Sequence, residues 1–472
     1  MSDARNQLFR RLPQLGEFLE SGAGEELLRA HPRALVVEVL RAELDRLREE
    51  IGRGGLAERA VDARVTALAA RVDALLRDAA QGALRSVINA TGVILQTNLG
   101  RAPLSARAVR AIADVASGYC NLEFDLASGE RGKRGGYVEQ LLLRAVGADA
   151  SRMSALVVNN CAAATLLALN TLAENGEVIV SRGELVEIGG GFRIPEILRK
   201  SGARLVEVGT TNRTRIGDYL EAITPETKLL LRVHRSNFEI VGFTEEPELR
   251  ELVDLGAERG IPVFVDQGTG CVASPERFGT RRQVTLADVA TSGAALVAAS
   301  GDKLLGGPQS GLLVGERAVI EKLRGNPLYR ALRVDKLTLA ALQETLGAYL
   351  GDEQETIPAL RMIAMEPDAV EKRCNFVARE FDRRGIAATV NLVHSVVGGG
   401  TTPGSTLVSF AVALEVPDMS AEQVAGRLRL LSPPVIGRIQ QDRVLLDMRT
   451  VPEEWDADLI DLIEECLRSA RP

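Results

Sequence analysis

The segment "AALVAASGDKLLGGPQSG", residues 294–311, places one lysine directly after a small apolar run and before a glycine-rich stretch. Lysine is rare in this chain, with seven lysines against fifty arginines. The pattern predicts a buried strand that ends just before Lys303. A solvated loop lysine is the ordinary alternative. However, a buried lysine can lose its proton and act as a nucleophile, which an arginine cannot do. Lys303 is therefore the first candidate catalytic residue.

Other short apolar runs alternate with helical patterns on either side of this segment. The strand candidates are "SALVVN", "GEVIVS", "ARLVEV", "KLLLRVH", "IPVFVD" and "SGLLVG". Amphipathic stretches such as "CAAATLLALNTLA" and "EPELRELVDLGAERG" lie between them. This alternation predicts an α/β fold whose sheet is mostly parallel, with right-handed crossovers.

The chain divides by pattern into three parts. Residues 1–85 carry helical periodicity and no convincing strand, which predicts a small helical domain. Residues 86–350 hold the alternating pattern, and we assign them to the catalytic domain. Residues 351–472 follow the boundary-like "GDEQETIP" and mix helical patterns with the strand-like "TLVSFAVAL" and "DRVLLDM", which predicts a small C-terminal α/β domain.

Bulk composition narrows the class of protein. The 472 residues carry a net charge of −7, so no overall basic field indicates a nucleic-acid partner. The five cysteines are scattered without a CxxC pair, and the three histidines are dispersed, so we expect no structural metal site. No apolar signal region or long apolar run is present, and we expect a cytoplasmic protein without a membrane span.

Three sequence elements fall at strand ends, where α/β sheets bind their ligands. Asn160, Cys161 and Ala162 open a helix whose free N–H groups suit a phosphate, although small residues there also pack well. Asp266 ends "IPVFVD" and could cap a helix or hold a protonated ring nitrogen. Ser300 precedes Lys303 by three residues. Together these residues predict pyridoxal 5′-phosphate, with a Schiff base on Lys303, the ring nitrogen on Asp266, and the phosphate at the helix start and Ser300.

Nucleotide cofactors are the rival for any α/β chain. No G-x-G-x-x-G follows the first strand with an acidic residue about 20 positions later, and no Walker-type G-x-x-x-x-G-K-[ST] occurs. The "GGG" runs at 189–191 and 398–400 lack the strand–turn–helix setting. Both nucleotide interpretations are therefore disfavoured.

Several long motifs carry a resemblance to a known family. They are "VINATGVILQTNLGRAPLS" (87–105), "YCNLEFDLASGERGKRG" (119–135), "SRGELVEIGGGFRIPEI" (181–197), "VGTTNRT" (208–214), "VHRSNFEIVGF" (233–243) and "GDKLLGGPQSG" (301–311). The chain resembles the bacterial selenocysteine synthases, the L-seryl-tRNA(Sec) selenium transferases, over nearly its whole length. The resemblance implies a pyridoxal-phosphate enzyme of the aspartate-aminotransferase fold.

The resemblance also implies a reaction and its partners. L-Seryl-tRNA(Sec) would be converted to L-selenocysteinyl-tRNA(Sec) with selenophosphate, by way of a dehydroalanyl intermediate. Lys303 would remove the Cα proton, and the N-terminal helical domain would bind the tRNA. Enzymes of this fold commonly form homo-oligomers built from dimers, and this family is known for larger rings.

The family's active-site arginines match Arg101 in "TNLGR" and Arg330 and Arg333 in "NPLYRALRVDK". A guanidinium matches a phosphate-like oxyanion with two parallel hydrogen bonds, which suits selenophosphate. The ordinary alternative for such arginines is a surface charge. His234 and Asn237 follow "KLLLRV" and could touch the ring, although a satisfied buried histidine fits equally well.

Two other functions stay open from the sequence. One is a lyase of the same fold that acts on a small phosphorylated amino acid or amino sugar acid, a class that typically lacks the N-terminal helical domain. The other is a non-catalytic tRNA-binding protein, which the intact Lys303 and Asp266 disfavour.

Overall fold

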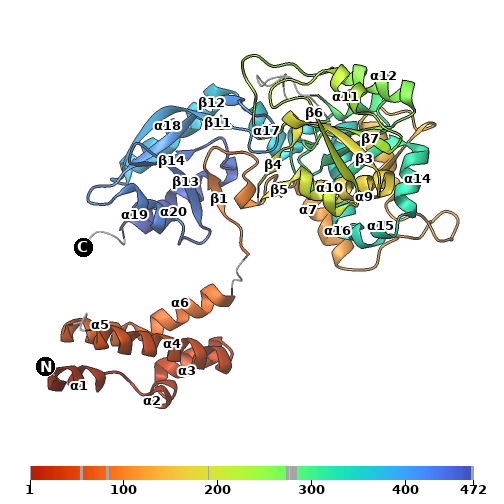
Figure 1. Cartoon of the computed structure of the whole chain (residues 1–472). Helices are drawn as coiled ribbons and strands as arrows, with labels where there is room; N and C mark the ends of the chain where they lie inside the picture. The colour runs from red at the N-terminus through yellow and green to blue at the C-terminus, as the bar shows by residue number, and fades with distance from the viewer. Residues whose placement is uncertain are drawn as a thin grey trace. The chain divides into compact units, whose positions relative to one another are not determined.

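The computed structural model describes residues 2–53, 57–80, 84–189, 191–272, 276 and 284–468 (Figure 1). The chain forms two compact units, one of residues 1–86 and one of residues 87–472. Each unit has its own hydrophobic core, and each is described by itself.

The first unit is helical in its described residues, as the sequence predicts. Its helices are α1 (Ser2–Phe9), α2 (Leu15–Leu19), α3 (Gly22–Ala30), α4 (Arg33–Gly52), α5 (Glu58–Thr66) and α6 (Leu68–Ala80). Val36, Leu40, Leu44 and Leu47 recur at three- and four-residue spacing along α4 and are buried. This spacing puts them on one face of the helix, where they pack with residues of α6 in one core.

A seven-stranded sheet organises the larger part of the second unit. Its strands are β2 (Met153–Val158), β3 (Glu177–Ser181), β6 (Arg204–Val208), β7 (Thr227–Val233), β8 (Val263–Asp266), β9 (Leu296–Ser300) and β10 (Gly311–Glu316). Their order across the sheet is β2-β10-β9-β8-β7-β3-β6. β10 runs antiparallel to both neighbours, and the other pairings are parallel. The predicted mostly parallel sheet is confirmed.

Helices and short elements surround this sheet. They are η1 (Thr97–Leu99), α7 (Ala106–Ala116), α8 (Gly136–Ala145), α9 (Cys161–Ala173), η2 (Arg182–Glu184), β4 (Glu187–Ile188), β5 (Phe192–Arg193), α10 (Ile194–Lys200), α11 (Ile216–Ala222), α12 (Leu249–Arg259), α13 (Leu286–Thr291), α14 (Arg317–Gly325), α15 (Pro327–Leu332) and α16 (Lys336–Leu350). Residues of α8, α12, α13 and α16 join one core cluster with the sheet, and residues of α9, α10 and α14 join another. A sheet buried on both faces explains why its strands read as continuous apolar runs.

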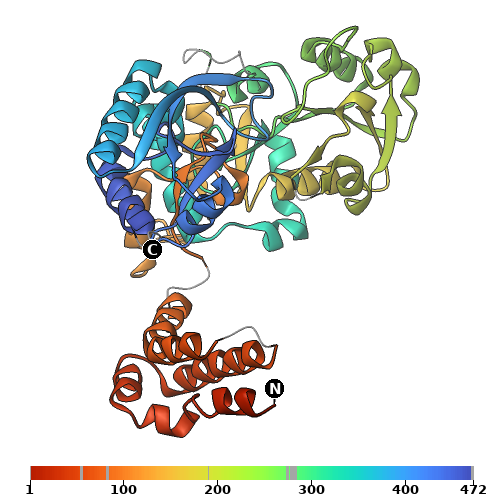
Figure 2. The same cartoon turned by 90° about the vertical axis from the view of Figure 1, so that its left-hand side faces the viewer.

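A smaller five-stranded sheet completes the second unit (Figure 2). Its strands are β1 (Ile88–Ala90), β11 (Ala387–Val396), β12 (Thr406–Glu415), β13 (Val435–Gln440) and β14 (Arg443–Asp447), in the order β1-β13-β14-β12-β11. The accompanying helices are η4 (Gln354–Thr356), α17 (Pro358–Ala364), α18 (Pro367–Arg383), α19 (Ala421–Leu428), η5 (Glu453–Trp455) and α20 (Asp456–Arg468). The helices and strands expected after residue 351 are therefore present, within the same compact unit as the large sheet.

One boundary differs from the sequence-based assignment. Residues 86–350 were expected to form the catalytic domain, but Ile88–Ala90 pairs with β13 in the C-terminal sheet. A three-residue strand has too little periodicity to show which sheet it joins. The chain therefore enters the small sheet first and then crosses to the large one. Among the described helices, none is both long enough and apolar enough to cross a membrane.

Candidate functional site

The carboxyl ends of the central strands bring the predicted site residues to one edge of the large sheet. Ser300 at the end of β9 pairs with Gly311, which in turn pairs with Val158 at the end of β2. Asp266, the last residue of β8, pairs with Val233 at the end of β7. The loops that follow these strands therefore start side by side, as expected for a parallel sheet.

Lys303 is buried, with 6% of its surface exposed. Among the described residues, its amine makes no hydrogen bond or ion pair, and the adjacent carboxylate of Asp302 pairs with Arg101 at 2.7 Å. Burial lowers the pKa of the Lys303 amine. At a given pH, Lys303 is therefore neutral and nucleophilic in a larger fraction of molecules than an exposed lysine is.

Asp266 is also buried, and both of its carboxylate oxygens face side chains of α9. The Thr165 hydroxyl lies 2.9 Å from Oδ2, and the Cys161 thiol lies 3.6 Å from Oδ1. Burial raises the pKa of Asp266, and the hydrogen bond from Thr165 opposes that shift. Burial also raises the pKa of the Cys161 thiol, so the thiol keeps its proton and can donate it. A carboxylate accepts about four hydrogen bonds, which leaves room for a further N–H.

Helix α9 begins directly after β2. The side chain of Asn160 caps it by accepting a hydrogen bond from the backbone N–H of Ala163 at 2.8 Å. Cys161 and Ala162 are the first two helical residues, whose N–H groups have no intrahelical partner. The buried hydroxyl of Ser300 contacts the Cys161 thiol. The helix start, Ser300 and Asp266 therefore meet as the sequence predicted.

A glycine-rich loop of the small sheet reaches this site. It joins β11 to β12, and a Cβ atom on Gly400 would lie 2.9 Å from the Lys303 amine. Gly400 has a φ of +81°, and Gly398 one of +129°, both unfavourable for other residues. The loop between β11 and β12 can therefore approach Lys303 this closely only with glycine at position 400.

His234 follows β7, and its backbone N–H donates to the Asp266 carbonyl at 2.9 Å. Its Nε2 atom is buried without a hydrogen-bond partner among the described residues. Burial lowers the pKa of this imidazole, which favours the neutral ring. Asn237, in contrast, is exposed and donates to the Glu187 carbonyl at 2.8 Å.

The three candidate arginines have different settings. Arg101 pairs with Asp302 next to Lys303 and adopts a φ of +63°, a strained conformation that is typical of functional positions. The backbone of Arg333 forms a bridge to Val158, so the end of α15 lies beside β2, and its guanidinium is 3.8 Å from Glu123. Arg330 is exposed. Neither Arg330 nor Arg333 contacts Lys303, Asp266 or Arg101 through a hydrogen bond or an ion pair.

Sequence reasoning missed Thr165, Asp302 and the loop at Gly400. Thr165 stands four residues after Cys161, on the same face of α9, and that spacing is visible in the sequence. Asp302 is adjacent to Lys303. For Gly400, the only sequence signal was the glycine run, which gave no indication of its partner.

The arrangement defines an α/β protein with a buried lysine–aspartate site at the carboxyl edge of its main sheet. The fold is shared with D-glucosaminate-6-phosphate ammonia-lyase, at a TM-score of 0.57 and 20% identity, over 83% of this chain and 98% of that chain.

Sequence comparison then identifies the family. The family model described as L-seryl-tRNA selenium transferase matches residues 87–452, and the one described as selenocysteine synthase N terminal matches residues 9–48. The L-seryl-tRNA(Sec) selenium transferase of Geobacter sulfurreducens is 46% identical over 97% of this chain and 99% of that protein. That of Aquifex aeolicus is 42% identical over 95% of this chain and 96% of that protein. The chain belongs to the L-seryl-tRNA selenium transferase family, which confirms the resemblance seen in the motifs.

Proposed function

We propose that this protein converts L-seryl-tRNA(Sec) to L-selenocysteinyl-tRNA(Sec), with pyridoxal 5′-phosphate bound to Lys303 and selenophosphate as the selenium donor. The observation that carries this proposal is the buried amine of Lys303, which has no hydrogen-bond or ion-pair partner among the described residues and lies near the buried carboxylate of Asp266. Membership in the family gives the reaction, and these residues suit it.

The residues present fit the cofactor. Asp266 can accept a hydrogen bond from a ring nitrogen, and the N-terminus of α9 with Ser300 can bind a phosphate. When bound, pyridoxal phosphate supplies an electron-withdrawing ring that stabilises negative charge at the carbon next to the substrate amine. The hydrogen bonds from Thr165 and Cys161 favour the ionised form of Asp266, which would keep the ring nitrogen protonated.

Lys303 then acts on the seryl group. Because its pKa is lowered, the amine can accept the Cα proton and can return a proton to the departing β-hydroxyl. Arg101 pairs with Asp302, the residue directly before Lys303, and would bind an oxyanion of the selenium donor. Arg330 and Arg333 would supply further positive charge to bind the same anionic donor.

The direct test incubates the purified protein with seryl-tRNA(Sec) and selenophosphate and identifies the aminoacyl product by mass spectrometry. We expect selenocysteinyl-tRNA(Sec), and we expect Lys303→Ala to abolish it. Lys322→Ala, at an exposed position in α14, is the matched control and should be active. Conversion of a small phosphorylated amino acid without action on seryl-tRNA(Sec) would favour the lyase alternative.

The N-terminal unit, expected as a domain of residues 1–85, is proposed to bind the tRNA body. Its match to the selenocysteine synthase N-terminal model supports this role. Arg46, Arg64 and Arg71 surround one cavity there, although each also pairs with Glu43 or Glu50. RNA is recognised largely through its shape and backbone. Deletion of the unit should weaken tRNA binding and leave cofactor binding intact; equal tRNA affinity would exclude the role.

We also propose a cytoplasmic homo-oligomer built from dimers, in the form of a larger ring. The second unit exposes large apolar side chains in two loops, at Tyr119 and Leu126 and at Val241 and Phe243. Exposed apolar patches are typical of interaction surfaces. Light scattering of the purified protein measures the assembly, and a monomeric mass would exclude it.

A further inference from the structure

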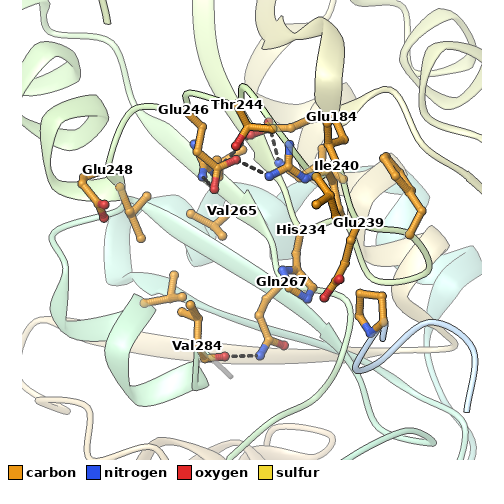
Figure 3. A pocket seen from close by; sticks show the side chains of 18 of the residues that line it. Glu184, His234, Glu239, Ile240, Thr244, Glu246, Glu248, Val265, Gln267 and Val284 are labelled. Carbon is orange, nitrogen blue, oxygen red and sulfur yellow. Dashed lines mark hydrogen bonds and ion pairs between the residues drawn. The ribbon is translucent and has the colours of Figure 1, made fainter. Parts of the chain in front are cut away.

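A cavity of about 680 Å³ lies next to the lysine site, and the chemistry above does not use it (Figure 3). It is bounded by the ends of β7 and β8, by the loop of residues 235–248, by Val284 and Val289, and by Pro403. Lys303 and Asp266 do not line it. Its volume falls within the range of small-molecule sites in proteins, roughly 300–1,000 Å³.

The cavity is within a short reach of Lys303. The loop that places Gly400 against the lysine amine also places Pro403 in the cavity wall. Three residues of extended chain span at most about 11 Å. His234, which is bonded through its backbone to Asp266, lies in the same wall. Any group attached closely to a substrate amino acid at Lys303 could therefore enter this cavity.

The arginines of the wall are paired with glutamates, and glutamates outnumber them. Arg232 pairs with buried Glu184 at 3.1 Å and with Glu246 at 3.4 Å, and Arg235 also pairs with Glu246. Glu239 and Glu248 also line the cavity, so its wall holds four glutamates against two arginines. A phosphate finds no free cation in this cluster, so the cavity favours a neutral occupant.

Apolar side chains make up another part of the wall. Val265 and Val289 are buried and line the cavity, together with Leu249 and Ile240. Phe238 also lines it and is 37% exposed, so its ring is accessible. Aromatic and apolar surfaces of this kind suit a stacked base.

One polar atom in the wall is unused. His234 Nε2 is buried without a partner among the described residues, and Figure 3 shows His234, Gln267 and Glu239 gathered on one side of the cavity. Unpaired buried polar atoms are rare because they forfeit hydrogen bonds to water. A ligand hydroxyl beside His234 would satisfy this atom.

We propose that this cavity holds the terminal nucleoside of the aminoacyl-tRNA, with the base against Phe238 and the ribose toward His234. The inference rests on the proposed function. In an aminoacyl-tRNA, the ribose follows the reacting amino acid after a single ester oxygen, and a nucleoside without its phosphate is neutral. The reach, the charge and the unpaired Nε2 therefore all match this group.

The test uses 3′-deoxy-3′-(L-alanylamino)adenosine, which has no β-hydroxyl to lose, and L-alaninamide, which lacks the nucleoside. Binding of each to the cofactor-loaded protein is measured by calorimetry. We expect the compound that carries the nucleoside to bind at least tenfold more tightly than L-alaninamide. Phe238→Ala should remove most of that gain, on the order of tenfold, since stacking is lost. Phe238→Trp should keep it, as should Phe376→Ala, a matched exposed phenylalanine in α18.

A photoreactive 8-azidoadenosine form of the probe locates the contact. We expect labelling within residues 235–249, and labelling elsewhere would overturn the inference. Equal affinity for both compounds in a protein that converts seryl-tRNA(Sec) would overturn the nucleoside site alone. A protein that takes up no cofactor on Lys303 would instead overturn the proposed function, and this inference with it.

Discussion

Replacing Thr165 with valine removes one hydroxyl and keeps the shape of the side chain. Thr165 is fully buried, with 0% exposure, and its hydroxyl lies 2.9 Å from Asp266 Oδ2. The hydroxyl lowers the pKa of Asp266, whereas burial raises it. In Thr165→Val, Asp266 therefore protonates at a higher pH. A protonated carboxyl no longer balances the charge of a protonated ring nitrogen.

The size of the effect follows from the kind of bond removed. A hydrogen bond to a charged group contributes about 1.5–3 kcal/mol. Water is excluded at this position and cannot replace the hydroxyl. We therefore expect Thr165→Val to destabilise the ionised carboxylate of Asp266 by about 2 kcal/mol. If cofactor binding needs that ionised form, this corresponds to roughly thirtyfold weaker binding of pyridoxal phosphate.

Cofactor binding is measured by titrating the cofactor-free protein with pyridoxal phosphate and following its absorbance at several pH values. Thr165→Ser keeps the hydroxyl and should bind nearly as well as the natural protein. Thr345→Val is the matched control, because Thr345 is buried in α16 and its hydroxyl donates to the Ala341 carbonyl, with no other hydrogen-bond partner among the described residues.

Two results would refute this reasoning. One is a Thr165→Val protein that binds the cofactor within twofold of the natural protein at each pH. The other is a Thr165→Ser protein as weak as Thr165→Val, which would make the methyl group, and not the hydroxyl, the cause.

Three further predictions test other contacts. Gly400→Ala should slow cofactor attachment, because its Cβ would lie 2.9 Å from the lysine amine at a φ of +81°; Gly399→Ala, with open space around it, should not. Arg101→Ala should raise the Lys303 pKa by removing a nearby positive charge and freeing Asp302, so cofactor uptake, followed by absorbance, should require a higher pH; an unchanged pH profile would contradict this. Burial raises the pKa of Glu184 to about 7 despite its pairing with Arg232. The folded protein thus retains a proton that the unfolded chain releases, so stability falls as pH rises from 4.5 to about 7, by roughly 3 kcal/mol. Glu184→Gln should flatten this dependence in urea unfolding, and an equal slope in both proteins would contradict it.

The sequence by itself determined the regular elements around the site. The helical stretch "CAAATLLALNTLA" has the bounds of α9 in the structure. The seven apolar runs of the main sheet are all strands. These patterns are local, because a helix or strand buried along one face or both repeats its apolar residues at a fixed spacing. Lys303, Asp266 and the start of α9 were identifiable for the same reason, since each directly follows such a run.

Only the tertiary structure decided which distant residues share the site. Arg101 and Asp302 are 201 positions apart, and Gly400 reaches Lys303 from another sheet. β1 joins the C-terminal sheet although 344 residues separate it from β13. Such pairings depend on how the sheets pack, and no periodicity within either segment encodes its partner. The cavity beside His234 has the same origin. Its walls come from five separate segments of the chain. Its surplus of glutamates, and the His234 nitrogen that has no partner among the described residues, exist only where those segments meet.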